Sequence, residues 1–172
     1  MKIIDMHEER RALAFLFKGV GVEIGTERGI YAKMIMVRGK PEALFCIDSW
    51  KVYGDYRHHI SQQKQNRLYL EARDRLQEFP NCILIRKFSM DAVKDFGDNT
   101  LDFVYIDANH EYKYVKEDIE EWARKVKKGG IIAGHDYLGE VKKAVDEYAQ
   151  AHGITTIHIY QKKEVPSWMF YV

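Results

Sequence analysis

Cysteine and proline are scarce in this sequence of 172 residues, which contains two cysteines and three prolines. Two thiols are too few for a scaffold built on disulfides. Cys46 and Cys82 each fall in an apolar stretch that is expected to form a buried strand, and free core cysteines are the ordinary interpretation. A reducing, cytoplasmic setting is therefore expected. Because no Ser/Gly-rich tract interrupts the chain, we expect a single domain over residues 1–172.

An excess of charge of one sign is also lacking. The chain has 27 basic and 26 acidic residues, a formal net charge of +1, and the two signs are interleaved. This balance gives no electrostatic case for nucleic acid or a membrane surface as a partner. No apolar run approaches the length of a transmembrane helix, and residues 1–5 contain no signal-peptide core. With 46% hydrophobic residues, the chain can instead bury one sizeable core.

Apolar strands alternate with helical patterns along most of the chain. Strands are predicted at residues 20–24, 43–47, 82–85, 101–106, 131–134, 155–160 and 168–172. A helix is predicted at residues 5–18, where Asp5-x-x-Glu8 is similar to a capping box. Ser89 is expected to cap a short helix, and Gly129-Gly130 to end a longer one. This alternation predicts the α/β class, with a mainly parallel sheet covered by helices on both faces.

The glycine-rich stretch from Gly19 to Gly29 lies between the first strand and the following helix. Glycine allows a ligand to approach the backbone closely, and a helix start offers free N–H groups. The spacing is Glu23-x-Gly25-x-x-x-Gly29, and Ile24 stands where the third glycine of a dinucleotide-binding G-x-G-x-x-G loop would fall. The alternative is a tight strand-to-helix turn that binds no ligand.

Residues with functional side chains follow several of the predicted strands. In open parallel sheets, ligands bind beyond the carboxyl ends of the strands. Asp48 follows Gly25 by about 20 residues, the spacing at which a carboxylate holds a ribose, although an aspartate here can also cap the next turn. The segment of residues 49–65 is rich in aromatic residues and is expected to be a functional loop. Its aromatic and histidine residues are Trp50, Tyr53, Tyr56, His58 and His59.

Two further motifs carry a specific resemblance. Residues 101–112 read LDFVYIDANHEY, and residues 129–137 read GGIIAGHDY. The pattern strand, I-D-x-x-H-x-Y, helix, G-G, strand, H-D-Y resembles small class I S-adenosylmethionine-dependent methyltransferases related to the catechol type and to antibiotic-sugar O-methyltransferases. The resemblance implies a Rossmann-like sheet of seven strands in the order 3-2-1-4-5-7-6, with the last strand antiparallel.

The resemblance also implies roles for individual residues. Gly25 and Gly29 would line the methionine end of S-adenosylmethionine with Glu23 in support, and Asp48 would hold the ribose. The complete set implied for the cofactor is Glu23, Gly25, Thr26, Gly29, Asp48, Ser49, Phe88, Ser89, Met90 and Asp107. Phe88, Ser89 and Met90 would lie against the adenine.

A divalent metal ion is implied by the catechol-type relatives. The matching residues are Asp107, His135 and Asp136, and His135 stands where those relatives carry an acid. A histidine favours Mn²⁺, Zn²⁺ or Fe²⁺ over Mg²⁺, or the absence of a metal. His135 and His110 are also the proton-acceptor candidates, because histidine titrates near neutral pH. The catalytic set is therefore Asp107, His110 and His135, with structural roles for both histidines as the alternative.

The function predicted on these grounds is O-methylation of a small molecule or sugar hydroxyl. An NAD(P)-linked oxidoreductase is one alternative, and it is disfavoured by the missing third glycine. A degenerate domain that keeps the fold as an interaction module is another. The expected partner is a small-molecule acceptor, with a homodimer as a further expectation in which a second subunit completes the pocket.

Overall fold

The computed structural model describes residues 1–52, 61–162 and 165–172, and these form one mixed sheet between two layers of helices. The sheet has the order β1-β7-β8-β6-β5-β2-β3-β4. Its strands are β1 (Lys2–Asp5), β2 (Val20–Ile24), β3 (Ala43–Asp48), β4 (Cys82–Arg86), β5 (Leu101–Ile106), β6 (Val126–Gly134), β7 (Thr156–Tyr160) and β8 (Ser167–Tyr171). All neighbouring pairs are parallel except those of β8, which runs antiparallel to both β6 and β7.

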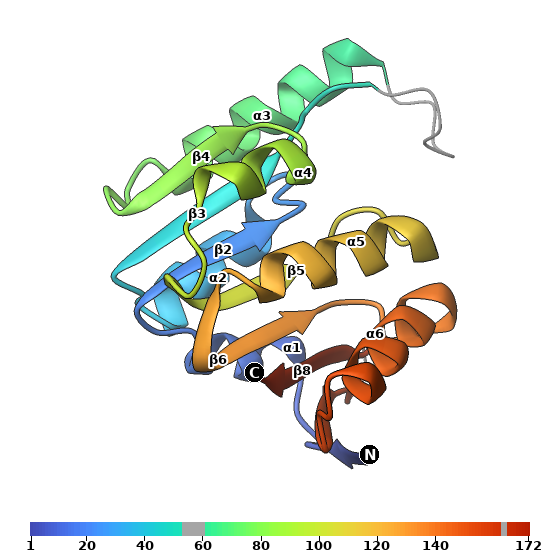
Figure 1. The fold of residues 1–172 in the computed structure, drawn as a ribbon. Coiled ribbons are helices and arrows are strands. Elements are labelled where there is room, and N and C mark those ends of the chain that lie inside the picture. Colours follow the sequence, from blue (N-terminus) through green and yellow to red (C-terminus); the bar gives the residue numbers. More distant parts are fainter. Residues whose placement is uncertain (53–60, 163–164) are drawn as a thin grey trace.

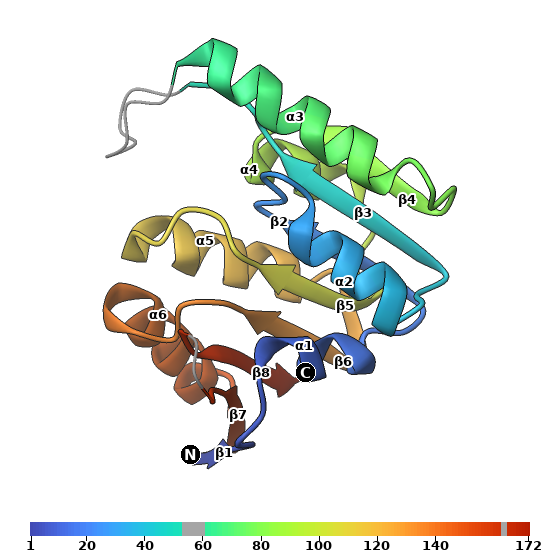
Figure 2. The same cartoon turned by 180° about the vertical axis from the view of Figure 1, so that it is seen from behind.

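Helices cover both faces of this sheet. The face seen in Figure 1 carries α4 (Ser89–Ala92), α5 (Tyr112–Ala123) and α6 (Gly139–Ala151), and the short turn η2 (Val93–Asp95) follows α4. The opposite face, seen in Figure 2, carries α1 (Arg10–Leu13), α2 (Ile30–Arg38) and α3 (Gln62–Leu76), with η1 (Ala14–Leu16) continuing α1. The predicted order 3-2-1-4-5-7-6 corresponds to β4-β3-β2-β5-β6-β8-β7 and is confirmed, as are the antiparallel last strand and the two helical layers.

Strand β5 shows how the sequence builds both layers of the core. Val104 and Ile106 pack into the cluster under α5 and α6, whereas Phe103 and Tyr105 face the layer of α1 and α2. Phe103 stacks on Phe17 with ring centroids 4.6 Å apart. A strand buried on both faces needs apolar side chains at every position, which explains the continuous apolar run in the sequence.

The N-terminal segment corrects the first helix prediction. Residues 2–5 form the edge strand β1, which pairs in parallel with β7, and α1 begins only at Arg10. Asp5 does not cap a helix, because its carboxylate accepts hydrogen bonds from the backbone N–H of His7 and the side chain of Gln161. The sheet therefore has an eighth strand beyond the seven that were predicted.

Two predicted helix boundaries are also wrong. Helix α5 ends at Ala123, and Gly129 and Gly130 lie inside β6 rather than after a helix. Ser89 is the first residue of α4 and not its cap, because its hydroxyl donates to Asp118 on α5 instead. Within the described residues, no helix is long and apolar enough to cross a membrane.

Candidate functional site

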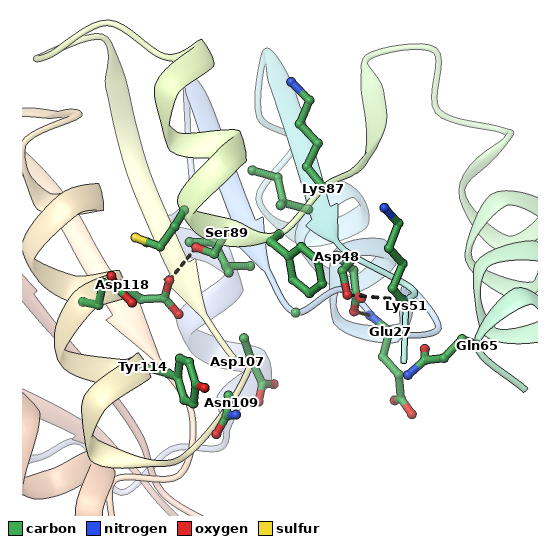
Figure 3. A pocket seen from close by; sticks show the side chains of 18 of the residues that line it. Glu27, Asp48, Lys51, Gln65, Lys87, Ser89, Asp107, Asn109, Tyr114 and Asp118 are labelled. Atoms are coloured by element: carbon green, nitrogen blue, oxygen red, sulfur yellow. Dashed lines mark hydrogen bonds between the residues drawn. The ribbon is translucent and has the colours of Figure 1, made fainter. Parts of the chain in front are cut away.

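A cavity of about 500 Å³ opens beyond the carboxyl ends of β2, β3, β4 and β5. Figure 3 shows Asp118 and Ser89 on one side of this pocket, and Asp48, Glu27 and Lys51 on the other. A volume of this size suits a small organic ligand or cofactor. Seven of the residues predicted to bind the cofactor line it: Gly25, Asp48, Ser49, Phe88, Ser89, Met90 and Asp107.

Gly25 brings two loops into direct contact at the floor of the pocket. Its φ of +87° lies in the left-handed region, and its N–H donates to the carbonyl of Ile47 at 2.8 Å. A Cβ at this position would lie 2.0 Å from the carbonyl oxygen of Asp107. Only glycine fits where the β2–α2 loop passes the end of β5 this closely.

Gly29 forms the N-cap of α2 with a φ of +70°, and no side chain caps this helix. The first N–H groups of a helix have no partner within the helix and carry the positive end of its dipole. The helix start therefore lies next to the glycine loop, as the sequence predicts for a ligand site.

Glu23 and Thr26 lie buried behind the loop, with exposed fractions of 2% and 4%. In the part of the chain that the structure describes, Glu23 Oε2 and Thr26 Oγ1 have no hydrogen-bond partner. Desolvation raises the pKa of Glu23 to about 8. The Thr26 hydroxyl opposes this rise in the pKa of Glu23, and neither residue lines the pocket, so both lie behind the site rather than in it.

We expect Glu23→Gln to change the pH dependence of stability. A carboxyl group with a pKa near 8 in the folded state and 4.5 otherwise keeps its proton longer when the chain is folded. The free energy of unfolding therefore falls as the pH rises from 4.5 to 8. Glutamine cannot ionise, so the variant should gain a few kcal/mol over the wild type between pH 5 and pH 8, at about 1.4 kcal/mol per pKa unit. Urea unfolding at both pH values measures this.

The matched control is Glu120→Gln, which changes an exposed acid on α5. It should follow the wild-type pH dependence. If Glu23→Gln does so as well, Glu23 is not a buried, destabilising carboxyl group.

Asp48 ends β3 and connects two loops. Its Oδ2 accepts a hydrogen bond from the backbone N–H of Glu27 at 3.0 Å, and its Oδ1 accepts one from that of Trp50 at 2.8 Å. The turn-capping alternative is therefore present in the structure. Burial raises the pKa of Asp48, which these backbone hydrogen bonds oppose. Each carboxylate oxygen can accept a second hydrogen bond, so the ribose role stays a prediction.

The aromatic segment after Asp48 is only partly described. Trp50 is fully buried, and its indole N–H donates to the carbonyl of Glu27 at 2.8 Å, so this residue supports the loop. The other residues singled out there, Tyr53, Tyr56, His58 and His59, lie outside the described residues. Ser61 caps α3, with its hydroxyl accepting from the backbone N–H of Lys64.

Asp118 is a pocket residue that the sequence analysis did not assign to the site. It is 4% exposed, and burial raises its pKa to about 7. Ser89 Oγ donates to Asp118 Oδ1 at 2.5 Å, and Trp122 Nε1 donates to Ser89 Oγ at 2.8 Å. The signal that could have identified it is its position, since Asp118 falls on the apolar face of α5 beside Ile119.

Asp107 ends β5 between the pocket and a second polar group. Its Oδ2 accepts a hydrogen bond from Arg10 Nη1 at 2.9 Å, and its Oδ1 lies 3.6 Å from His110 Nε2. Arg10 comes from α1 and lies over the ring of Tyr31, 4.2 Å from the centroid. Arg10 could not be assigned to the site from the sequence, because α1 reaches the site only through the packing of the helical layer.

Asp136 lies between the two histidines. His110 Nε2 is 3.1 Å from Asp136 Oδ2, and His135 Nδ1 is 3.0 Å from the same oxygen. Hydrogen bonding to Asp107 and the nearby Asp136 charge raise the pKa of His110, and the interaction with His135 lowers the pKa of Asp136. His110 is about half exposed, whereas 18% of the His135 side chain is exposed.

The predicted metal ligands were Asp107, His135 and Asp136. Among the described residues, the group whose ligand atoms all lie within 4.8 Å of one another is Asp107, His110 and Asp136. His135 lies beside this group, with its Nδ1 3.9 Å from Asp107 Oδ1. His135 Nδ1 is also 3.0 Å from Asp136 Oδ2, so both histidines are candidate nitrogen donors for a metal at this position.

Comparison with known proteins identifies a family for this chain. A family profile described as a methyltransferase domain matches residues 22–137, which is more than half of the chain. The matched range begins in β2 and ends just after β6. It therefore contains both the glycine loop and the group of Asp107, His110 and Asp136.

Three solved structures share the fold at low sequence identity. A precorrin 8W decarboxylase from Methanobacterium thermoautotrophicum is 17% identical with a TM-score of 0.66, covering 94% of this chain and 88% of that one. The O-methyltransferase NovP is 17% identical with a TM-score of 0.65, covering 94% and 74%. A putative methyltransferase from Streptococcus mutans, solved in complex with SAH, is 13% identical with a TM-score of 0.66, covering 92% of each chain.

A curated relative is the uncharacterized protein y4gI from Sinorhizobium fredii (strain NBRC 101917 / NGR234). It is 25% identical over 125 residues, which is 67% of this chain. The match covers 13% of that relative, so this chain spans only a small part of its length.

Proposed function

The chain belongs to the methyltransferase-domain family, and we propose that it methylates a hydroxyl group of a small molecule or sugar with S-adenosylmethionine as the methyl donor. The observation that carries this proposal is the pocket of about 500 Å³, in which the glycine loop, Asp48 and Ser89 meet at the carboxyl ends of four strands. A structural turn alone would not need a cavity of this size beside it.

The residues present fit this cofactor. Bound S-adenosylmethionine supplies an activated methyl group on a sulfonium sulfur. Glu23 and Thr26 are buried behind the glycine loop and do not line the pocket, so their role toward the cofactor is indirect. Asp48 has free acceptor capacity for ribose hydroxyls. Gly25 leaves the loop backbone open to close approach.

Methylation of a hydroxyl requires a group that takes its proton. The polar group formed by Asp107, His110 and Asp136 lies directly beyond the pocket, and Asp107 belongs to both. His110 Nε2 points between the two carboxylates and can hold a proton there. The resemblance of the fold to NovP, which is described as an O-methyltransferase, further supports oxygen as the acceptor atom.

We also propose that Asp107, His110 and Asp136 are able to hold a divalent cation. Two carboxylates and one imidazole are a donor set for Mn²⁺, Zn²⁺ or Fe²⁺ more than for Mg²⁺. Such an ion would lower the pKa of a hydroxyl bound to it. Arg10 already neutralises one oxygen of Asp107, so the site also has a cation of its own. The homodimer and the cytoplasmic location stay predictions.

The cofactor prediction is tested by calorimetry with S-adenosylhomocysteine. We expect it to bind and to raise the melting temperature, because a ligand of the native state stabilises the fold. NAD should do neither, since the loop lacks the third glycine of a dinucleotide site. Absence of binding at millimolar S-adenosylhomocysteine would contradict the proposed function.

Asp48→Asn tests the ribose contact. The substitution keeps the shape of the side chain but removes its charge, and hydrogen bonds to charged groups contribute about 1.5–3 kcal/mol each. We therefore expect the affinity for S-adenosylhomocysteine to fall by about 10-fold to 100-fold. Asp74→Asn, at an exposed position on α3, is the matched control and should bind as the wild type does. Equal affinity of both variants would refute the ribose role.

A further inference from the structure

We propose that Asp118 recognises the exocyclic amino group of the cofactor's adenine and makes the pocket selective for adenine over hypoxanthine nucleosides. This inference rests on the proposed function, because it assigns a residue to the base of the proposed cofactor. Asp118 lines the pocket from α5, whereas the residues that the resemblance implied for the adenine lie at the start of α4.

The hydrogen bonds around Asp118 have a fixed direction. The indole N–H of Trp122 can only donate, and it donates to Ser89 Oγ at 2.8 Å. The single hydroxyl hydrogen of Ser89 is then directed to Asp118 Oδ1 at 2.5 Å. Both hydrogen bonds are directed toward Asp118, so its ionised carboxylate presents an acceptor to the pocket. A ligand atom that meets it must therefore be a donor.

The second carboxylate oxygen is free to accept that donor. Among the described residues, Asp118 Oδ2 has no hydrogen bond, and no lysine, arginine or histidine forms an ion pair with this side chain. The carboxylate is 4% exposed, and the little surface that remains belongs to the pocket. Asp118 Oδ2 is not one of the fully buried side-chain atoms without a partner in the described residues, so a donor on a ligand in the pocket can reach it.

The surroundings of Asp118 suit a flat aromatic base. Phe88, Met90 and Ala108 line the same pocket and contribute apolar surface, and Figure 3 shows Asp118 and Ser89 on the side of the pocket opposite Asp48. A ligand held by its ribose at Asp48 would thus place its base among these side chains and direct the edge of that base at Asp118. Adenine carries an amino donor at position 6, whereas hypoxanthine carries a keto oxygen.

A site with a buried acceptor discriminates strongly against a ligand that presents another acceptor. The keto oxygen of hypoxanthine would face the carboxylate without a hydrogen between them, and both groups would lose their water. We expect the wild type to bind S-adenosylhomocysteine at least 100-fold more tightly than S-inosylhomocysteine. The 7-deaza analogue of S-adenosylhomocysteine, which keeps the amino group and loses only the neighbouring ring acceptor at position 7, should bind within about threefold of the parent.

Asp118→Asn tests the assignment directly, because the amide can donate as well as accept. Calorimetry should show weaker binding of S-adenosylhomocysteine, stronger binding of S-inosylhomocysteine, and a preference reduced at least 10-fold. Glu120→Gln changes an exposed acid on α5 that does not line the pocket, and should keep the wild-type preference.

The outcomes separate the two proposals. A wild type that binds neither nucleoside contradicts the proposed function as well. A wild type that binds both nucleosides equally overturns the role of Asp118 alone, and so does an Asp118→Asn variant that keeps the full preference. Should Asp118→Asn fail to fold, the wild type can still be compared with the adenosyl, inosyl and 7-deaza ligands. If the 7-deaza ligand loses as much affinity as the inosyl ligand, the protein does not recognise the amino group, and the role of Asp118 is overturned.

Discussion

Replacing Gly25 by alanine is expected to abolish binding of S-adenosylhomocysteine and to destabilise the fold by several kcal/mol. The new Cβ would lie 2.0 Å from the carbonyl oxygen of Asp107 and 2.7 Å from the Cα of Ala108. Both contacts are to backbone, so no side-chain rotation relieves them. The β2–α2 loop and the end of β5 must separate, and these are two of the walls of the pocket. We expect an affinity loss beyond 100-fold, because catalytic and binding geometries tolerate shifts of only about 0.5 Å.

Gly129→Ala separates this clash from backbone strain. Gly129 has a φ of +81°, close to the +87° of Gly25, but nothing lies within 4 Å of its Cβ position. Its substitution should cost about 1–2 kcal/mol, the strain of a left-handed conformation alone. Urea unfolding of both variants gives the difference due to the clash, and calorimetry gives the effect on binding. Equal destabilisation of the two variants, with normal binding by Gly25→Ala, would show that the loops are not in contact.

The continuous apolar runs predicted most of the strands, and the order of the sheet could be predicted because the two motif regions resemble one family. The edge strand β1 could not. Its four residues are too few to show a period, and Asp5-x-x-Glu8 is typical of a helix start. Pairing with β7, from the other end of the chain, makes this segment a strand. Similarly, Gly129 and Gly130 look like a helix stop, but β6 continues through them because it pairs with β5 and β8.

The candidate site was predictable to the extent that it consists of residues at strand ends. Gly25, Asp48 and Asp107 follow their strands directly, so the topology alone brings them together. Arg10 and Asp118 come from helices, and only the packing of those helices determines what they contact. The sequence also could not show which of His110 and His135 is the proton acceptor, because both follow strands of the same sheet.

The side-chain directions, however, distinguish His110 from His135. The imidazole of His110 is half exposed and lies between two carboxylates, whereas His135 is mostly buried. The backbone carbonyl of His135 also accepts a hydrogen bond from Trp168 Nε1, which fixes it to β8. On these contacts we propose the chemical role for His110 and a supporting role for His135.

His110→Ala is accordingly expected to lower turnover by about 10²–10⁴, the usual contribution of a general base, with little change in affinity for S-adenosylhomocysteine. Turnover is measured as the release of S-adenosylhomocysteine with an acceptor found in a panel of phenols and sugars. His152→Ala, at the exposed C-cap of α6, is the control. A chelator then determines the role of His110. If the group of Asp107, His110 and Asp136 holds an ion, chelation abolishes turnover and one divalent metal restores it. If His110 acts without metal, chelation has no effect.

Loss of turnover in His135→Ala but not in His110→Ala would return the role to His135. Full turnover in His110→Ala, His135→Ala and Asp136→Ala would make the whole group structural, so that methyl transfer would depend on alignment of the two substrates alone.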